Sequence, residues 1–214
     1  MAYLTANGVA VSEGRLTLPL VGRGVASLSL EPTDVAFAQG DPVELTFDGS
    51  ITYRMAVQRV GLEHGSPRLL LVAGAGGLSK VLAPKAYAAN VAGATVVRDV
   101  LREAGEAAGD VDVPGSFVHW VRGRAPAYAS LDALMATWSD RAWRVKRDGK
   151  VWVGRDAWPA GPAVVVTERR ALAGAAVLEV APALEPGVEL AELGRVVRVV
   201  HDVSKARKTE VWTA

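Results

Sequence analysis

Short apolar segments separated by turn sequences run from residue 1 to about residue 83, and this spacing limits the possible folds more than any other feature. Glycine, aspartate and proline gather between the segments, as in Gly40-Asp41-Pro42 and Asp48-Gly49-Ser50. Several short strands at such intervals indicate a small β-barrel or β-sandwich. The predicted strands are Arg15–Leu20, Val25–Leu30, Val43–Phe47, Ile51–Val60 and Arg68–Ala73.

The first clear hairpin can be placed in register from its side chains. A three-residue loop, Asp48-Gly49-Ser50, places apolar residues opposite one another, whereas a two-residue loop would place them opposite polar ones. The predicted pairs are Phe47 with Ile51, Leu45 with Tyr53 and Val43 with Met55.

The apolar period becomes helical between Pro84 and Trp158. A stripe over Val96–Ala104, followed by Gly105, predicts one helix and its end. Ser130 is the expected N-cap of a second helix. Its apolar positions at i, i+3, i+4 and i+7 are Leu131, Leu134, Met135 and Trp138.

A hairpin is expected over residues 141–154, with Asp148-Gly149 as a two-residue turn. That turn would pair Val145 with Trp152 and place Trp143 on the same face, covering the second helix. Five of the six tryptophans lie between Trp120 and Trp158. A short module with a core of large rings explains this clustering.

A β pattern returns after Pro159, with strands predicted at Val164–Val166, Ala175–Val180, Arg195–Val203 and Thr209–Thr213. In Arg195–Val203, alternation places Val197 and Val199 on one face and Val196 and Val200 on the other. Such a strand suits burial between a barrel core and a neighbouring subunit, or packing inside a monomer.

The predicted fold class is α+β, mostly β, with two β modules flanking a helix–hairpin module. The predicted boundaries are 1–83 for the N-terminal β-barrel module, 84–158 for the helical and hairpin module, and 159–214 for the C-terminal β-barrel module.

Charge and cysteine content exclude several classes of function. The 24 Lys and Arg against 23 Asp and Glu give a net charge of +1, which argues against binding nucleic acid or membranes by bulk charge. The absence of cysteine excludes disulfides, thiol catalysis and Cys-ligated metals. The first residues have no signal-peptide pattern, and the longest apolar run, Leu69–Leu78, is too short to cross a bilayer.

The run Gly74-Ala75-Gly76-Gly77 follows an apolar segment and suggests a nucleotide-binding loop. Ser79 stands where the third glycine of a GxGxxG motif would be, and no parallel βαβ unit follows. A connector between two parts of the chain is the preferred interpretation.

No catalytic, cofactor-binding or metal-binding residue is predicted, and no cofactor. The histidines His64, His119 and His201 are far apart and lack partners at helical spacing, so each is interpreted as solvated or hydrogen-bonded. Adjacent strand residues point to opposite faces, so His201 and Asp202 are not expected to form a base and its partner. The pairs Glu103 with Glu106 and Asp110 with Asp112 are expected to be solvated.

Two basic runs, Arg141–Lys150 and Arg195–Lys208, leave an oligonucleotide-binding barrel conceivable. If the hairpin tryptophans cover the second helix, the arginines of the first run fall on a solvated face. We prefer this interpretation because the total charge is near neutral.

Several features in order resemble the hub proteins of phage-tail baseplates and of related contractile injection systems. These features are a Gly40-Asp41-Pro42-Val43 strand start, Tyr87 followed by the helix TVVRDVLREAGE, the segment LDALMATWSDRAWRVKRDGKVWVG closing at Trp158-Pro159, and the end LEPGVELAELGRVVRVVHDVSKARKTEVW. The resemblance covers nearly the whole chain, and hub proteins share no catalytic signature.

The resemblance implies a structural virion protein of the tail baseplate, made in the host bacterial cytoplasm. It implies a homotrimer in which each subunit carries two β-barrel modules akin to the tail-tube fold. Its partners would be the hexameric tail tube, a three-fold spike or tip protein and other baseplate proteins, with no membrane and no sequence-specific nucleic acid.

Two alternatives from other classes remain. One is a β-barrel module that binds sugar or oligonucleotide through the face of Trp143, Val145 and Trp152. The other is a small hydrolase with a site between modules, for which the spacing of histidines and carboxylates offers no support.

Overall fold

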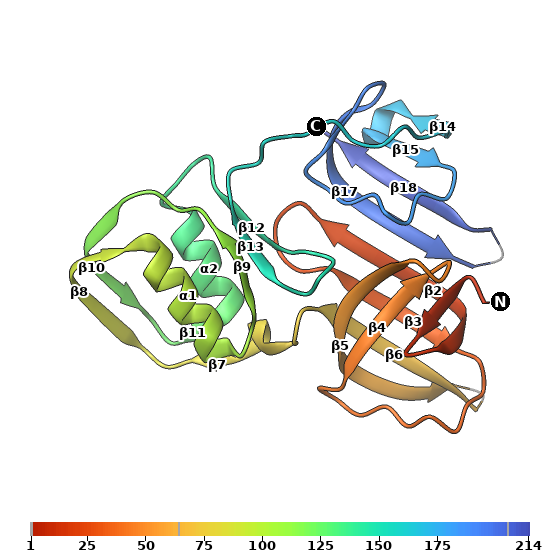
Figure 1. Cartoon of the computed structure of the whole chain (residues 1–214), viewed down its shortest axis with the longest axis horizontal. Coiled ribbons are helices and arrows are strands. Elements are labelled where there is room, and N and C mark those ends of the chain that lie inside the picture. The colour runs from red at the N-terminus through yellow and green to blue at the C-terminus, as the bar shows by residue number, and fades with distance from the viewer. Residues whose placement is uncertain (1, 64, 205) are drawn as a thin grey trace.

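The computed structural model describes residues 2–63, 65–204 and 206–214, which form mostly β-strands with two α-helices. Figure 1 shows a helical part on the left, a β-barrel at the lower right and the C-terminal strands at the upper right. The predicted fold class, α+β and mostly β, is confirmed at this level.

Six antiparallel strands close the barrel in the order β1-β4-β5-β6-β3-β2, and β1 pairs with β2 to complete the ring. Alternate residues point inward, so Leu16, Leu28, Leu45, Phe47 and Leu71 are fully buried and form its core. The strands are β1 (Leu4–Ala6), β2 (Val9–Pro19), β3 (Val25–Leu30), β4 (Pro42–Phe47), β5 (Ile51–Glu63) and β6 (Ser66–Ala73).

The predicted register of the β4–β5 hairpin is confirmed. Phe47 pairs with Ile51, Leu45 with Tyr53 and Val43 with Met55. On the outer face of the barrel, the hydroxyls of Thr46 and Thr52 lie 3.0 Å apart and share a hydrogen bond.

Strand β2 belongs to two parts of the sheet. On one side it pairs with β3. On the other side its residues Val9–Ala10 pair with β1, and its residues Gly14–Pro19 pair with β17. From β17 the sheet continues through β18 and β15 to β14, and β16 pairs with β17. The bounds are β14 (Val166–Arg170), β15 (Ala175–Leu178), β16 (Glu189–Leu190), β17 (Gly194–Val203) and β18 (Lys208–Thr213), with the short helix η2 (Ala171–Ala173) between β14 and β15.

The C-terminal strands therefore extend the sheet of the barrel. Pairing among the described residues closes one ring, and the predicted second barrel stays a prediction.

The predicted alternation in β17 is wrong, because a β-bulge lies between Val196 and Arg198. The bulge shifts the phase of the strand, so Val196 and Val199 lie on the same face. Val196, Val199 and Val200 are all fully buried, whereas Val197 is half-buried.

The helical part follows the short helix η1 (Gly77–Ser79). Its helices are α1 (Gly93–Ala104) and α2 (Ala127–Met135), which pack against each other. Its strands form separate small sheets: β8 pairs with β10, β7 pairs with β11, and β13 pairs with both β12 and β9. Their bounds are β7 (Val81–Leu82), β8 (Lys85–Ala92), β9 (Ala108–Val111), β10 (Ser116–Arg122), β11 (Ala125–Pro126), β12 (Ala142–Val145) and β13 (Val151–Gly154).

Helix α1 confirms its prediction, since Gly105 takes a left-handed conformation at φ +84° and ends it. The predicted start of α2 at Ser130 is wrong. The helix begins at Ala127, whose N–H donates to the Lys80 carbonyl at 3.0 Å, after Pro126 in an extended conformation. Ser130 lies inside the helix, and Trp138 lies beyond its end.

The predicted two-residue turn of the second hairpin is also wrong. Val145 pairs with Val151 and Arg144 with Trp152, so the register differs by one residue. The amide of Gly149, at φ +80°, donates to the Lys146 carbonyl at 2.9 Å, and Lys146 pairs with Lys150 around a three-residue loop. This register lets valines line the core face of both strands.

Large aromatic rings pack within the helical part, as the clustering of tryptophans in the sequence predicts. Phe117 lies between Trp120 and Trp138, with ring centroids 4.8 and 5.3 Å away. Gly93 makes room for Trp138, because a Cβ there would lie 2.9 Å from its ring. Trp143 is buried and donates from Nε1 to Asp132 of α2 at 2.7 Å.

We expect Gly14→Val to lower the free energy of unfolding by about 1–3 kcal/mol, because overpacking forces core side chains to move. A Cβ at Gly14 would lie 2.9 Å from Leu28 Cδ2 and 3.2 Å from Leu4 Cδ2. Gly61→Val in β5 is the matched control, because no atom lies within 4 Å of a Cβ there. Urea unfolding measures both, and equal losses would contradict this account of Gly14.

Candidate functional site

The glycine-rich connector encloses a carboxylate of the chain itself. The amides of Ala75 and Leu78 donate to the two carboxylate oxygens of Glu106 at 2.9 and 3.2 Å. Glu106 follows the C-cap of α1 and is only 6% exposed. Successive backbone N–H groups form a concave anion site, and here the anion is Glu106.

Close packing explains why this connector needs glycine. A Cβ at Gly77 would lie 2.1 Å from the Ala104 carbonyl oxygen, and one at Gly74 would lie 2.6 Å from Glu106 Oε2. Gly74 and Gly76 also take left-handed conformations. The interpretation of this run as a connector agrees with its place between β6 and β7.

The expectation that Glu106 is solvated is wrong. Burial raises the pKa of Glu106, although hydrogen bonds from the backbone amides act in the opposite direction. A glutamate directly after a helix-ending glycine was the available signal, but its partners lie about 30 residues earlier in the chain.

A second charged cluster attaches α1 to strands β8 and β10. Asp99 accepts hydrogen bonds from Lys85, from Arg102 and from the Tyr87 hydroxyl, the last at 2.6 Å. Burial acts to raise the pKa of Asp99, but the hydrogen bonds from Lys85 and Tyr87 outweigh it and lower the pKa below its usual value. Glu103 of the same helix binds Lys85 at 2.9 Å.

Arg122 completes this cluster from β10. It is 4% exposed and donates to Glu103 at 2.5 Å and to the Ala83 carbonyl at 2.9 Å. Positive and negative groups alternate and contact one another in this cluster, so it stabilises the packing of α1 against the two strands. It also gives Tyr87 a role, since its hydroxyl binds the helix that follows it.

His201 lies in the core beside aromatic rings of the barrel. Its Nδ1 lies 3.1 Å from the Thr209 hydroxyl, and its Nε2 lies 3.3 Å from the Leu184 carbonyl. Its ring centroid is 5.6 Å from that of Phe47. Burial lowers its pKa to about 4, so the ring is neutral near pH 7. This confirms the interpretation of His201 as hydrogen-bonded.

His119 is not part of this group. His119 is exposed on β10, and His64 lies outside the described residues. Within residues 2–63, 65–204 and 206–214, His, Asp and Glu side chains form no group of three that could hold a metal ion. No helix in the same residues is long and apolar enough to span a membrane.

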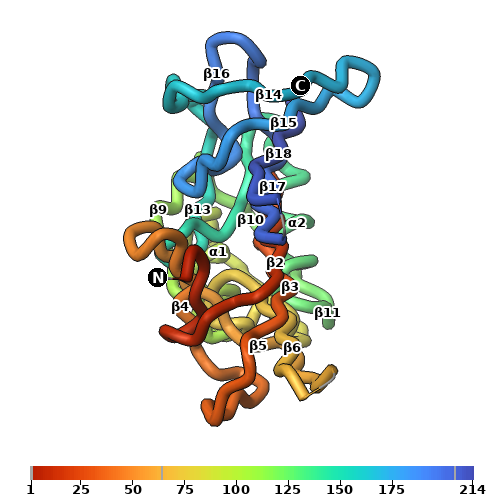
Figure 2. The backbone as a smooth tube through the Cα atoms, turned by 90° about the vertical axis from the view of Figure 1, so that its right-hand side faces the viewer, coloured from red at the N-terminus to blue at the C-terminus, as the bar shows by residue number. Residues whose placement is uncertain are grey.

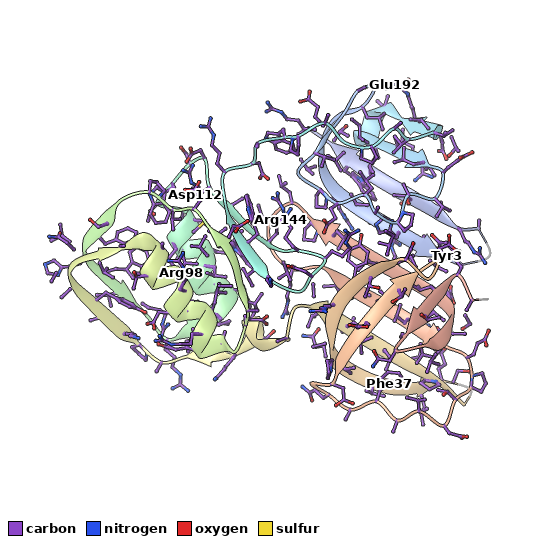
Figure 3. The ribbon with its side chains drawn as sticks, in the orientation of Figure 1. Tyr3, Phe37, Arg98, Asp112, Arg144 and Glu192 are labelled. Atoms are coloured by element: carbon purple, nitrogen blue, oxygen red, sulfur yellow. The ribbon has the colours of Figure 1, made fainter. Side chains whose placement is uncertain are left out.

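Arg144 of the helical part contacts both the barrel, at Leu20, and the C-terminal part, at Gly187. Its guanidinium donates to Asp156 at 2.5 Å and to the Leu20 carbonyl at 3.3 Å, and it stacks 4.2 Å from the centroid of Trp152. Gly187 packs so closely that a Cβ there would lie 2.5 Å from Arg144 Nη2. Figure 3 shows Arg144 at the centre of the molecule, between its three parts.

Two expectations are therefore wrong. Arg144 does not belong to a solvated face, because it is 6% exposed and its Nη1 and Nη2 groups donate to the Leu20 carbonyl and to Asp156. Trp152 does not cover α2, since it pairs with Arg144 on the opposite face of the hairpin from Trp143.

Comparison with known proteins gives a likeness at the level of structure. No protein-family model matches the chain, and no curated protein matches it in sequence. Solved structures match it over 97% of its length. The E. coli c3393 protein, a component of the type VI secretion system with structural similarity to T4 bacteriophage tail proteins gp27 and gp5, matches with a TM-score of 0.75 and 11% identity over 75% of its own chain.

Two tail proteins match as well. The 43 kDa tail protein of prophage MuSo2 from Shewanella oneidensis has a TM-score of 0.70 and 10% identity, with 95% of its chain covered. The tail protein from Neisseria meningitidis MC58 has a TM-score of 0.63 and 13% identity, with 94% covered. The chain has the fold of phage tail proteins. The predicted resemblance is thus confirmed for the fold over nearly the whole chain.

Within this tail-protein fold, several buried or half-buried charged groups connect separate segments of the chain. Glu106 fixes the connector that leaves the barrel, Asp99 and Glu103 fix α1, and Arg144 joins three segments. Glu106 is bound by backbone amides, whereas Asp99, Glu103 and Arg144 are bound by groups of opposite charge.

We expect Glu106→Gln to lower the free energy of unfolding by about 1–3 kcal/mol, because two buried amides would lose a charged acceptor. Urea unfolding of this variant and of Glu31→Gln, a change at an exposed glutamate, measures the difference. If the two variants are equally stable, the carboxylate does not hold the connector.

The stability of the wild type should fall as the pH drops from about 6.5 to about 4. An unfolded chain binds a proton at His201 in this range while the folded chain does not, which removes up to about 3 kcal/mol. His201→Gln should lose less stability over the same range, whereas His119→Gln should behave like the wild type. Denaturant unfolding at each pH tests this, and an unchanged pH dependence in His201→Gln would contradict it.

Proposed function

We propose that this protein is a structural component of a phage tail or a related contractile injection system. It would act as a homotrimeric baseplate hub that joins the hexameric tail tube to a three-fold tip or spike. The observation that carries the proposal is the likeness of fold over 97% of the chain to a type VI secretion component and to two phage tail proteins.

The proposed hub would connect two structures of different symmetry, the six-fold tail tube and the three-fold tip. In the proposed trimer, the closed barrel is one tail-tube-like module, and the strands β14, β15, β17 and β18 are the core of the second. Three chains would then present six related modules to the tube and three-fold symmetry to the tip. The proposed modules are residues 1–83, 84–158 and 159–214.

The proposal has no enzymatic step. It places the protein in the virion tail after synthesis in the host cytoplasm, with tube, tip and other baseplate proteins as partners. The alternative of a sugar or oligonucleotide module that uses the face of Trp143, Val145 and Trp152 has little support. Trp143 is 2% exposed and Val145 is 7% exposed, so neither presents a binding surface.

The purified chain should form a species of about 67 kDa, three times its mass of 22.4 kDa. Light scattering after size exclusion, over a wide concentration range, measures this with and without a tail-tube protein. A chain that remains monomeric in both conditions would contradict the trimeric hub.

A further inference from the structure

A cleft lies where the helical part meets the C-terminal part. It has a volume of about 340 Å³, which falls within the range of small-molecule sites. Its lining comes from the loop before β12, the segment after β13 and the start of β17. Figure 1 shows the segment after β13 running from the helical part to the C-terminal strands. Polar and charged side chains predominate in the lining, so the cleft suits a polar ligand.

Trp158 lines this cleft in an unfavourable backbone conformation. Its φ is +49°, in the left-handed region, where a bulky residue is an outlier. Pro159 follows it, and a residue before proline normally takes an extended conformation. The chain is fixed on both sides, because Asp156 binds Arg144 at 2.5 Å and the Pro159 carbonyl accepts from the Glu189 amide at 2.9 Å. Backbone outliers of this kind gather at ligand-binding sites, so Trp158 is a candidate ligand contact.

The anchoring at Glu189 attaches this segment to the C-terminal strands. Glu189 belongs to β16, which Figure 2 places at the same end of the molecule as β14. Ala160 also forms a β-bridge with Glu189. The tryptophan is therefore presented from a segment that is held at both of its ends.

Asp156 supplies a fixed hydrogen-bond acceptor on the same cleft. Its side chain is 10% exposed, and its Oδ1 accepts from Arg144 at 2.5 Å. Within the described part of the chain, no group donates to its other oxygen, Oδ2. Because Asp156 lines the cleft, Oδ2 can accept a hydrogen bond from a ligand that carries a hydroxyl group.

The cleft also carries arginines without a close carboxylate partner. Arg195 is exposed and forms no ion pair with any residue that the structure describes, and its guanidinium lies 5.2 Å from the centroid of the Trp158 ring. Arg155 is 73% exposed and lies 3.9 Å from Asp140, at the limit of an ion pair. Arg141, in contrast, binds Asp140 at 2.7 Å. Arg195 and Arg155 are thus the donors available to an acidic ligand.

This mixture of groups favours one class of ligand. A carboxylate acceptor needs a donor, a guanidinium pairs well with a carboxylate, and an aromatic ring packs against C–H groups. A sugar that carries a carboxylate offers all three features. A nucleic-acid strand suits the cleft less, because its phosphates would face the carboxylates of Asp140 and Asp156 and have no hydrogen to donate to them.

We propose that this cleft binds an acidic sugar. The sugar ring would pack against Trp158, a hydroxyl would donate to Oδ2 of Asp156, and the carboxylate would pair with Arg195. The cleft is separate from the face of Trp143 and Val145, which the packing of the second hairpin buries. The inference goes beyond the proposed function and does not depend on it, because one chain supplies every group.

Titration of the purified chain with methyl β-D-glucuronide tests the proposal, and methyl β-D-glucoside provides the same ring without the charge. Isotope-labelled tryptophan makes the readout local, because the indole N–H signal of Trp158 should shift while that of Trp212 should not. The glucuronide should bind about tenfold more tightly than the glucoside, because its carboxylate pairs with Arg195.

Two variants and one control assign the binding to this cleft. Arg195→Gln should remove the preference for the glucuronide, and Trp158→Gly should weaken the binding of both sugars. Arg198→Gln is the matched control, since Arg198 stacks on Trp212 at 4.6 Å on the same strand, β17, and lies outside the cleft. Circular dichroism should show native structure in Trp158→Gly, because glycine takes the left-handed conformation without strain.

Several results would overturn the proposal. These are the absence of any saturable shift with the glucuronide, equal affinity for the two sugars, or an equal loss in Arg195→Gln and Arg198→Gln. Inorganic phosphate that binds as tightly as the glucuronide would show a site for anions alone. Displacement of the glucuronide by oligothymidylate would assign the cleft to a nucleic-acid strand instead. None of these results bears on the trimeric hub, which the mass of the purified chain tests separately.

Discussion

Strand β2 is the element on which the rest of the structure depends, because its hydrogen bonds are divided between two neighbours on one side. Its first residues pair with β1 and close the barrel, and its later residues, from Gly14 to Pro19, pair with β17. The first and last thirds of the chain thus share one sheet. The small size of Gly14 is part of this arrangement, since three apolar side chains fill the space beside it.

Buried polar groups hold the helical part against this sheet. Glu106 binds the connector as it leaves the barrel. Arg144 donates to the Leu20 carbonyl at the barrel end and to Asp156 of its own module, and it packs against Gly187 of the C-terminal segment. A buried charge is costly unless its hydrogen bonds are satisfied, so each group favours one relative placement of the segments it joins.

The sequence predicted best what depends on neighbours along the chain. The register of the β4–β5 hairpin followed from apolar pairing, and Gly105 marked the end of α1. The predicted register of the second hairpin was wrong. Asp148-Gly149 suggests a two-residue turn, but a three-residue loop places Val151 and Val153 on the core face. Ser130 resembled an N-cap, but α2 begins earlier because Lys80, far away in sequence, supplies an acceptor.

Interactions between distant segments were beyond such reasoning. The residues next to Glu106 in sequence do not reveal that a loop about 30 residues earlier binds its carboxylate. Those next to Arg144 do not reveal that its guanidinium donates to the Leu20 carbonyl. The same holds for the pairing of β2 with β17, which no local pattern encodes.

The division of β2 also sets an order of events during synthesis. All six strands of the barrel lie within the first 73 residues, so the ring can close early, whereas β17 begins only at Gly194. Until then the Gly14–Pro19 edge of β2 stands open, with backbone groups able to pair with any passing strand. Contacts between residues so far apart in sequence form slowly. A chain whose barrel closed before β17 was made would carry one unprotected strand edge, and the pairing of β17 would remove this risk of aggregation.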